Sequence, residues 1–144
     1  MQSSWVLWAL GSAVFAALTA IFGKIGVQAI NSDLATLIRT VIIAIVLTGL
    51  LLVTGQLRHP GPIAGRTWLF LTLSALATGA SWLCYYRALR LGDAARVAPI
   101  DKLSVVLVAV FGVAFLGERL GVRAWCGVGC IGLGAVLIAL KPGA

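Results

Sequence analysis

The chain has 144 residues, of which 61% are hydrophobic and only 10% are charged, and its mean hydropathy is +1.09. A soluble domain normally carries about 25% charged residues, so a chain this apolar would lack the polar surface that water requires. We therefore predict a single-domain, all-α integral membrane protein. The net charge of +7 does not indicate nucleic-acid binding, because no basic patch with interleaved aromatic residues lies outside the apolar segments. We expect the basic residues to contact lipid headgroups and to line one polar cavity.

Five apolar segments follow one another along the chain, at residues 5–23, 34–53, 67–89, 94–116 and 122–140. The first segment is longer than the core of a signal peptide and has no basic residues before it. Each segment has about the length that crosses a hydrocarbon core of about 30 Å as a helix. We therefore predict five transmembrane helices.

Turn and interface residues separate these segments. Asn31-Ser32-Asp33 has the chemistry of a helix start, and residues 55–66 form a loop rich in proline and glycine. We expect His59 in this loop to be a solvated histidine and not a metal ligand. Tryptophans open the first, third and fifth segments, which alternate threading places at one membrane face as an aromatic belt: Trp5, Trp8, Trp68 and Trp125.

Small residues recur at helical spacing in two of the segments. Ser12, Ala16, Ala20 and Gly23 form one ridge in the first segment, and Gly127 and Gly134 lie on one face of the fifth. Such ridges allow helix backbones to approach closely in lipid. We expect them to form helix-packing or dimer contacts.

Charged residues inside the apolar segments indicate a functional site, because burying a charge in lipid is costly. Arg39 lies about 8 Å inside the second segment, Lys24 follows the first, and Asp101 and Lys102 lie in the fourth. Pro99, just before them, removes one backbone hydrogen bond, so we expect a kink or break that acts as a hinge.

These charges have a functional and a structural interpretation. In the functional one, Lys24, Arg39 and Lys102 attract an anionic or zwitterionic group, and Asp101 is their counter-ion or a proton carrier. Trp82, Tyr85 and Tyr86 then line the apolar part of a solute site. In the structural one, Asp101 neutralises a neighbouring base and Lys24 reaches the interface. A third possibility is that Pro99 begins a helix and Asp101 is a helix-start carboxylate.

Enzymatic chemistry has little support in the sequence. The chain has no Ser/His/Asp set, no phosphate-binding glycine loop and no metal-ligand spacing, and we expect no cofactor and no bound metal. The three cysteines, Cys84, Cys126 and Cys130, lie in apolar segments and are expected to be packing thiols. We also expect Glu118, after the helix stop at Gly117, to form a solvated pair with an arginine.

The basic residues are nearly balanced between the two membrane faces. Four belong to the N-terminal face (Arg58, Arg66, Arg119 and Arg123) and five to the opposite one (Lys24, Arg87, Arg90, Arg96 and Lys141). Such a balance gives the positive-inside rule little to act on, so the chain is able to insert in both orientations. The alternative is one orientation with the C-terminus inside.

The order of these features resembles the EamA-type transporters of the drug/metabolite transporter superfamily. The resemblance covers nearly the whole chain: a small-residue first segment ending in GK (Gly23-Lys24), an early arginine in the second, YYRAL from Tyr85, LGDAARVAP up to Pro99, and FLGERL before a glycine-rich last segment. Most members carry two five-helix units in opposite orientations. This chain resembles the short form with one unit.

The resemblance implies a multi-pass protein of the cell inner (plasma) membrane that moves a small metabolite or drug-like solute by alternating access. Inverted repeats place the substrate at their interface, so we expect two copies to pair as an antiparallel homodimer of ten helices. The alternatives are a half-transporter that pairs with a paralogue and a membrane scaffold without transport activity.

Overall fold

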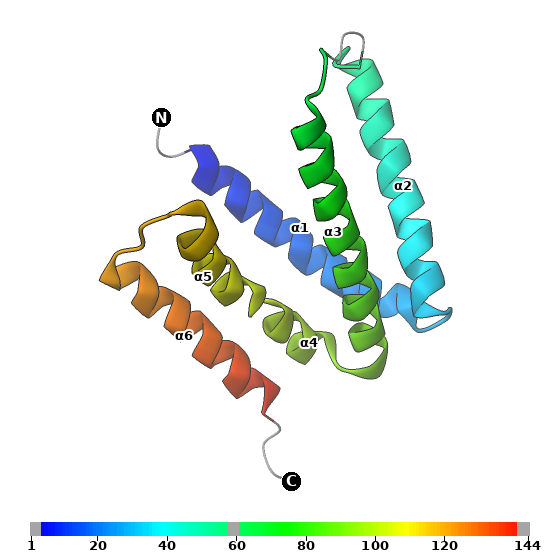
Figure 1. Ribbon diagram of the computed structural model, residues 1–144. Coiled ribbons are helices and arrows are strands. Elements are labelled where there is room, and N and C mark those ends of the chain that lie inside the picture. Colours follow the sequence, from blue (N-terminus) through cyan, green and yellow to red (C-terminus); the bar gives the residue numbers. More distant parts are fainter. Residues whose placement is uncertain (1–3, 58–60, 141–144) are drawn as a thin grey trace. The chain divides into compact units, whose positions relative to one another are not determined.

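A computed structural model describes residues 4–57 and 61–140. Three of the residues discussed above lie outside the described residues: Arg58, His59 and Lys141. Within the described ranges the chain is all-helical, without strands (Figure 1). The helices are α1 (Ser4–Val27), α2 (Ser32–Val53), α3 (Gly65–Leu91), α4 (Ala94–Asp101), α5 (Ser104–Leu116) and α6 (Val122–Ala139).

The prediction of five apolar helical spans is confirmed. The helices long and apolar enough to cross a membrane cover Trp5–Val27, Ser32–Val53, Gly65–Leu91, Ala94–Leu116 and Val122–Ala139. The first extends four residues beyond the predicted end at residue 23, so Lys24 lies inside helix α1 and not behind it. The fourth is made of two consecutive helices, α4 and α5.

Local chemistry explains where α2 begins and where α5 ends. Asn31 caps α2, because its side-chain oxygen accepts a hydrogen bond of 2.8 Å from the backbone N–H of Asp33, which satisfies one of the free N–H groups of the first turn. Gly117 ends α5 in a left-handed conformation, with φ of 69°. The N–H groups of Gly117 and Glu118 both bond to the carbonyl of Gly112. Gly117 is therefore the helix stop that the sequence predicted.

The break between α4 and α5 lies just after Pro99. Pro99 is inside α4, where it has no N–H to donate to the preceding turn. The next hydrogen bonds span three residues, as in a 3₁₀ turn. The backbone N–H of Lys102 donates to the carbonyl of Pro99 at 3.1 Å, and that of Leu103 donates to the carbonyl of Ile100 at 3.0 Å. The predicted break exists, but the helix ends at Asp101, two residues past the proline. Pro99 is not a first helical residue, so the idea that Asp101 is a helix-start carboxylate is wrong.

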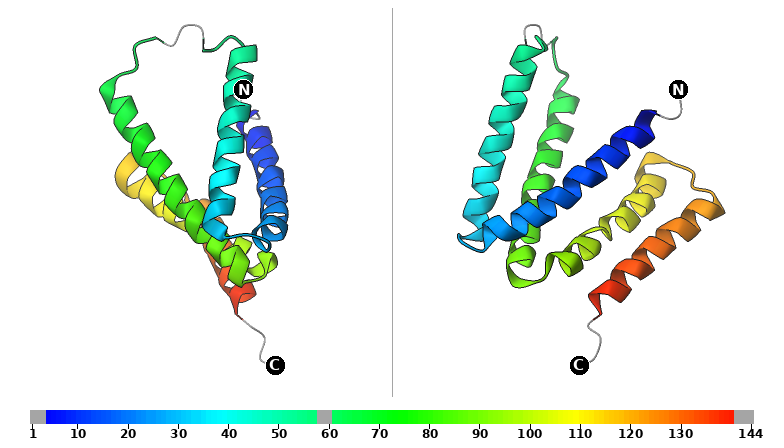
Figure 2. Two further views of the ribbon diagram at one scale, coloured as in Figure 1. Left: turned by 90° about the vertical axis from the view of Figure 1, so that its right-hand side faces the viewer. Right: turned by 180° about the vertical axis from the view of Figure 1, so that it is seen from behind.

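The described residues form two compact units. One, here called the α2–α3 unit, is Phe22–Arg90 and contains the end of α1 with α2 and nearly all of α3. Its two long helices run antiparallel and diverge toward the segment that joins them (Figure 2). The other, the α4–α6 unit, contains the described parts of Met1–Ile21 and Leu91–Ala144. In it α6 packs against both α4 and α5.

Few side chains are buried in the chain by itself. The described apolar core consists of Ala20, Val27, Ala35, Tyr86, Leu89 and Ala135, while large apolar side chains are exposed along every span. Trp8, for example, is 81% exposed and Leu91 89%. Apolar surface on this scale requires lipid or another protein to cover it.

Candidate functional site

Arg39 lies on the buried face of α2. The positions one and two turns before it on that face, Ala35, Thr36 and Ser32, are all buried, and Arg39 continues their spacing of three and four residues. Its guanidinium carbon lies 4.6 Å from the centroid of the Trp82 ring and 4.9 Å from that of Tyr86. Cation–π contacts of this kind contribute about 0.5–2 kcal/mol each.

Trp82 and Tyr86 are held toward Arg39 by the pattern of α3. They are four residues apart, so they lie one above the other on one face of the helix. Leu89, on the same face, is fully buried and Tyr86 is 2% exposed. Tyr85 packs edge-on against Tyr86, with ring centroids 5.9 Å apart. The three aromatic residues of the sequence prediction are therefore together, and two of them contact Arg39.

Two polar atoms of this cluster are buried without a hydrogen-bond partner among the described residues. They are one terminal nitrogen of Arg39, Nη1, and the hydroxyl oxygen of Tyr86. Leaving a buried donor unpaired costs about 1–3 kcal/mol, and more when the group is charged. The cation–π contacts do not remove this cost, because a ring face offers no hydrogen-bond acceptor of normal strength.

Lys24 has a different role in this conformation. Its amine donates a hydrogen bond of 2.7 Å to the backbone carbonyl of Leu89, in the last turns of α3. A lysine in that position satisfies one of the unpaired carbonyls and complements the negative end of the helix dipole. Lys24 thus links the end of α1 to the end of α3, a contact that was not predicted from the sequence.

The neighbouring residue of α1 explains the glycine of the GK pair. A Cβ placed on Gly23 would lie 2.8 Å from the hydroxyl oxygen of Tyr86, which is closer than packed atoms allow. Gly23 therefore makes room for Tyr86. The GK and YYRAL segments, more than 60 residues apart in the chain, meet at these two contacts.

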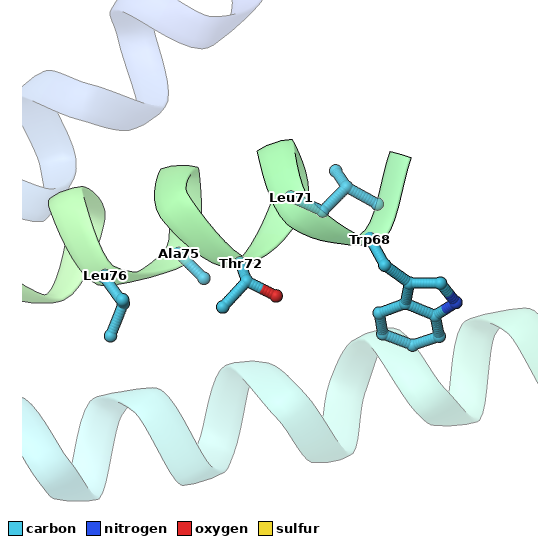
Figure 3. Close-up of a pocket in the computed structure, with 5 residues that line it drawn as sticks. All are labelled: Trp68, Leu71, Thr72, Ala75 and Leu76. Atoms are coloured by element: carbon cyan, nitrogen blue, oxygen red, sulfur yellow. The ribbon is translucent and has the colours of Figure 1, made fainter. Parts of the chain in front are cut away.

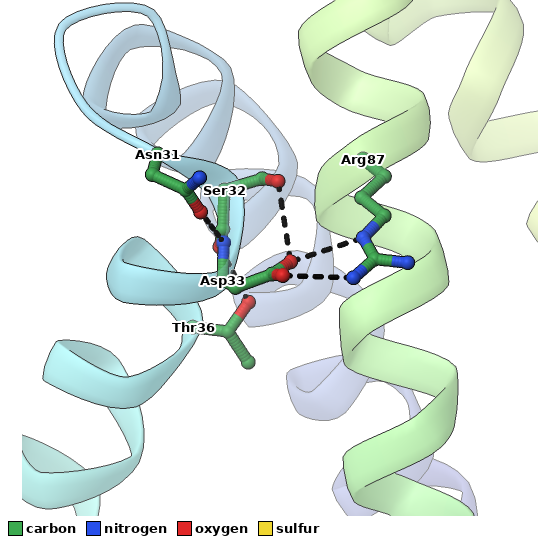
Figure 4. Close-up of polar contacts among 5 residues, drawn as sticks. All are labelled: Asn31, Ser32, Asp33, Thr36 and Arg87. Carbon is green, nitrogen blue, oxygen red and sulfur yellow. Dashed lines mark hydrogen bonds and ion pairs between the residues drawn. The ribbon is translucent and has the colours of Figure 1, made fainter.

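An ion pair joins the start of α2 to the end of α3 (Figure 4). The guanidinium of Arg87 donates two hydrogen bonds to the carboxylate of Asp33, at 3.0 and 2.7 Å. Ser32 adds a longer bond of 3.4 Å to the same carboxylate. From the sequence, Asp33 was assigned to a capping turn and Arg87 to the basic residues of one membrane face, and the two were not paired. The antiparallel course of α2 and α3 was the signal, since it brings those two ends together.

Asp101 and Lys102 belong to the α4–α6 unit. The Lys102 amine lies 3.6 Å from the Asp101 carboxylate, and both side chains are partly exposed. Their position at the break between α4 and α5 follows from Pro99. Asp101 is thus paired with the basic residue that follows it in the sequence, at the point where the fourth span is discontinuous.

Glycines of the α4–α6 unit fall into two groups. A Cβ on Gly132 would lie 3.3 Å from Val106 of α5, and one on Gly112 would lie 2.7 Å from the Glu118 carboxylate. Neither glycine was among the packing residues predicted from the sequence. Gly127 and Gly134, which were predicted, have no described atom within 4 Å of such a Cβ.

The small-residue ridge of α1 becomes more buried toward the end of that helix. Ser12 is exposed, Ala16 is half-buried, and Ala20 and Gly23 are buried.

Glu118 differs from its predicted environment. The described residues contain no ion pair between Glu118 and either Arg119 or Arg123. Instead its side chain folds back over Gly112, which has no side chain in the way. The prediction of a solvated pair with an arginine is therefore wrong, because the glycine stop at Gly117 turns the chain back onto α5.

An open apolar groove of about 430 Å³ lies along α3, facing α2 (Figure 3). Its lining is one polar side chain among apolar ones: Trp68, Leu71, Thr72, Ala75 and Leu76. It contains none of the charged residues predicted for the site.

Among the described residues, no group of three or more His, Cys, Asp or Glu is placed to hold a metal ion. The three cysteines are free and are exposed on the isolated chain.

Comparisons with known proteins agree with this arrangement of apolar helices. The model of the EamA-like transporter family matches residues 3–140. An uncharacterized transporter in the cobO 3' region of Sinorhizobium sp is 64% identical over 140 residues, which cover 97% of this chain and 99% of that relative. No solved structure matches. A match over nearly all the chain, together with five spans, shows that this protein is a multi-pass membrane protein belonging to the EamA-like transporter family.

Proposed function

We propose that the protein moves a small anionic or zwitterionic solute across the cell inner membrane. The observation that carries the proposal is Arg39, a charged residue inside an apolar span whose Nη1 is buried without a hydrogen-bond partner in the described chain. A helix that only packs in lipid gains nothing from such a group. Trp82 and Tyr86 provide the apolar side of the site.

Alternating access is the mechanism we propose for this movement. The break after Pro99 makes the fourth span discontinuous, and transporters commonly place solute and ion sites at discontinuous helices. Asp101 and Lys102 lie at this break. In the proposed mechanism, Pro99 is a hinge, and Asp101 is the counter-ion or the carrier of a coupled proton.

An antiparallel homodimer is the proposed working form. The Sinorhizobium relative aligns over 99% of its own length with 97% of this chain, so a chain of nearly the same length is named as an uncharacterized transporter. The exposed apolar faces need cover, and Gly127 and Gly134 leave space on α6 for another helix. The nearly balanced basic residues allow both orientations.

Transport is tested with purified protein reconstituted into liposomes. The liposomes are incubated with a mixture of carboxylic acids, amino acids and amines, and the solutes retained inside are quantified by mass spectrometry. We expect accumulation of at least one anionic or zwitterionic solute above protein-free liposomes. Pro99→Ala, which restores a backbone donor at the break, should slow this flux without lowering thermal stability.

The alternatives give different results in the same assay. A membrane scaffold accumulates no solute under any condition. A half-transporter accumulates none by itself, but gains activity when it is reconstituted with a paralogous chain. Flux from the single purified chain contradicts both alternatives.

A further inference from the structure

The α2–α3 unit contains many more basic than acidic residues. Residues 22–90 include six basic residues and one acidic residue, Asp33. Asp33 already accepts two hydrogen bonds from Arg87 and one from Ser32. The only carboxylate of the unit is therefore engaged elsewhere, and the unit supplies no acidic partner for Arg39.

Arg39 retains hydrogen-bonding capacity in its aromatic environment. A guanidinium carries five N–H donors in one plane and no acceptor, a geometry that suits planar oxyanions. Trp82 and Tyr86 contact it through their ring faces, which partly compensates the charge but accepts no ordinary hydrogen bond. Nη1 is left without an acceptor.

Tyr86 contributes a second donor at the same place. Its hydroxyl is buried and has no partner among the described residues, and it belongs to a ring over which the Arg39 guanidinium lies. Gly23 leaves the room that this hydroxyl occupies, because a Cβ at residue 23 would lie 2.8 Å from it. A charged donor of α2 and a neutral donor of α3 thus lie together between two apolar spans.

We propose that Arg39 and Tyr86 together bind one oxyanion of the solute, a carboxylate in the first instance, and that Trp82 forms the apolar wall beside it. The inference rests on the proposed function and narrows the solute to an organic anion. An oxygen that accepts from both groups would remove two unpaired buried donors at once, and hydrogen bonds to a charged group are the strong ones in such sites. Lys24, in contrast, is assigned to positioning, because its amine bonds the end of α3.

The test is direct binding to the purified protein in a neutral detergent. Acetate, benzoate and inorganic phosphate are titrated by calorimetry, with benzamide as the neutral counterpart of benzoate. We expect wild-type protein to bind benzoate at least about tenfold more tightly than benzamide. Arg39→Gln should weaken anion binding by about 10- to 100-fold, and Tyr86→Phe by up to about tenfold.

Arg66 supplies the matched control. It also lies over an aromatic ring, at 5.8 Å from the Phe70 centroid, but it stands exposed at the start of α3. Arg66→Gln should bind the anions as the wild type does. Arg39→Lys keeps the charge without the planar donors, and it replaces Arg39→Gln as the decisive variant if the latter unfolds.

Several results would overturn the proposal. These are the failure of wild-type protein to bind any of the three anions, equal binding of benzoate and benzamide, and wild-type affinity in a folded Arg39 variant.

Titration with phosphatidylglycerol distinguishes binding of a lipid headgroup from binding of a solute. If only lipid binding depends on Arg39, the site does not serve the solute. Anion binding through Arg39 without flux in liposomes would refute the proposed function and leave this inference standing; flux with unchanged anion binding in Arg39→Gln would do the reverse.

Discussion

Gly23 of α1 and Tyr86 of α3 are in direct contact, and the glycine is required by the tyrosine hydroxyl. A Cβ at residue 23 would lie 2.8 Å from that oxygen and 3.2 Å from the ring carbon that bears it. The ring itself is 2% exposed, so it has little freedom to move away. The position of Tyr86, and with it the aromatic environment of Arg39, therefore depends on the absence of a side chain at residue 23.

This contact predicts that Gly23→Ala is destabilising. Overpacking a buried site costs about 1–3 kcal/mol, whereas replacing glycine by alanine within a helix normally gains about 0.5–1 kcal/mol. Gly79→Ala is the control, because Gly79 lies in the middle of α3 and no described atom is within 4 Å of the new Cβ. It should be neutral or stabilising. Thermal unfolding in detergent measures both.

The double variant Gly23→Ala/Tyr86→Phe identifies the clashing atom. Removing the hydroxyl makes room for the methyl group, so the double variant should recover part of the stability that Gly23→Ala loses. The recovery appears as a coupling free energy in the double-mutant cycle. Additive losses would show that the alanine acts somewhere other than on Tyr86.

The Asp33–Arg87 pair should contribute modestly to stability. Both side chains are largely exposed, at 45% and 60%, and exposed pairs are worth about 0.2–1 kcal/mol even with good geometry. Asp33→Asn should lower the unfolding temperature slightly, with a smaller effect at high salt because salt screens exposed charges. Asp93→Asn is the control, since Asp93 precedes α4 without a side-chain capping bond. A large, salt-independent loss would show that the pair is buried in the working protein.

Two glycines of α6 should separate folding from assembly. Gly132→Leu should destabilise the chain itself, because a Cβ there would already lie 3.3 Å from Val106. Gly134→Leu meets no described neighbour, so we expect it to leave the stability of the chain unchanged and to weaken the proposed dimer. Light scattering and thermal unfolding, with Leu137→Ile as the control on α6, measure the two effects. Wild-type oligomer mass in Gly134→Leu would show that this face is not a contact.

Both termini should occur on both sides of the membrane in comparable amounts. Cys84, Cys126 and Cys130 are exposed on the isolated chain, so they are first replaced by serine. Single cysteines are then placed at Gln28 and at Gln56, which follow α1 and α2 respectively. A membrane-impermeant reagent applied to whole cells should label a fraction of each. Labelling of one site alone would contradict the antiparallel homodimer.

Asp101 should matter more for flux than for stability. Its partner is the adjacent Lys102, at 3.6 Å, with side-chain exposures of 37% and 54%. Losing a partly exposed pair costs less than about 1 kcal/mol. Asp101→Asn should therefore keep the fold and lose solute flux or its dependence on external pH, and Lys102→Gln should alter solute affinity. A loss of about 3–5 kcal/mol, as expected for a broken buried pair, would indicate a structural counter-ion instead.

The sequence by itself determined the class of protein and the course of the chain. Apolar segments of membrane-spanning length have no alternative to helical structure in lipid, because every backbone group must bond within its own segment. Local chemistry was sufficient for the start of α2 at Asn31 and for the stop at Gly117. The aromatic residues of the candidate site were also found, since Trp82, Tyr85 and Tyr86 lie at helical spacing on one short stretch.

Only the tertiary structure decided which side chains meet. A helix fixes which residues share a face, but it does not fix which face of a distant helix lies opposite. Arg39 was expected to attract an anionic or zwitterionic group, and only the structure shows that its guanidinium lies over Trp82 and Tyr86. Asp33 pairs with Arg87 because the antiparallel helices α2 and α3 bring the start of one to the end of the other. Lys24 reaches the carbonyl of Leu89 because the C-terminal ends of α1 and α3 lie together. Asp33, the one carboxylate of the α2–α3 unit, is paired with Arg87, so Arg39 has no acidic partner within its own unit.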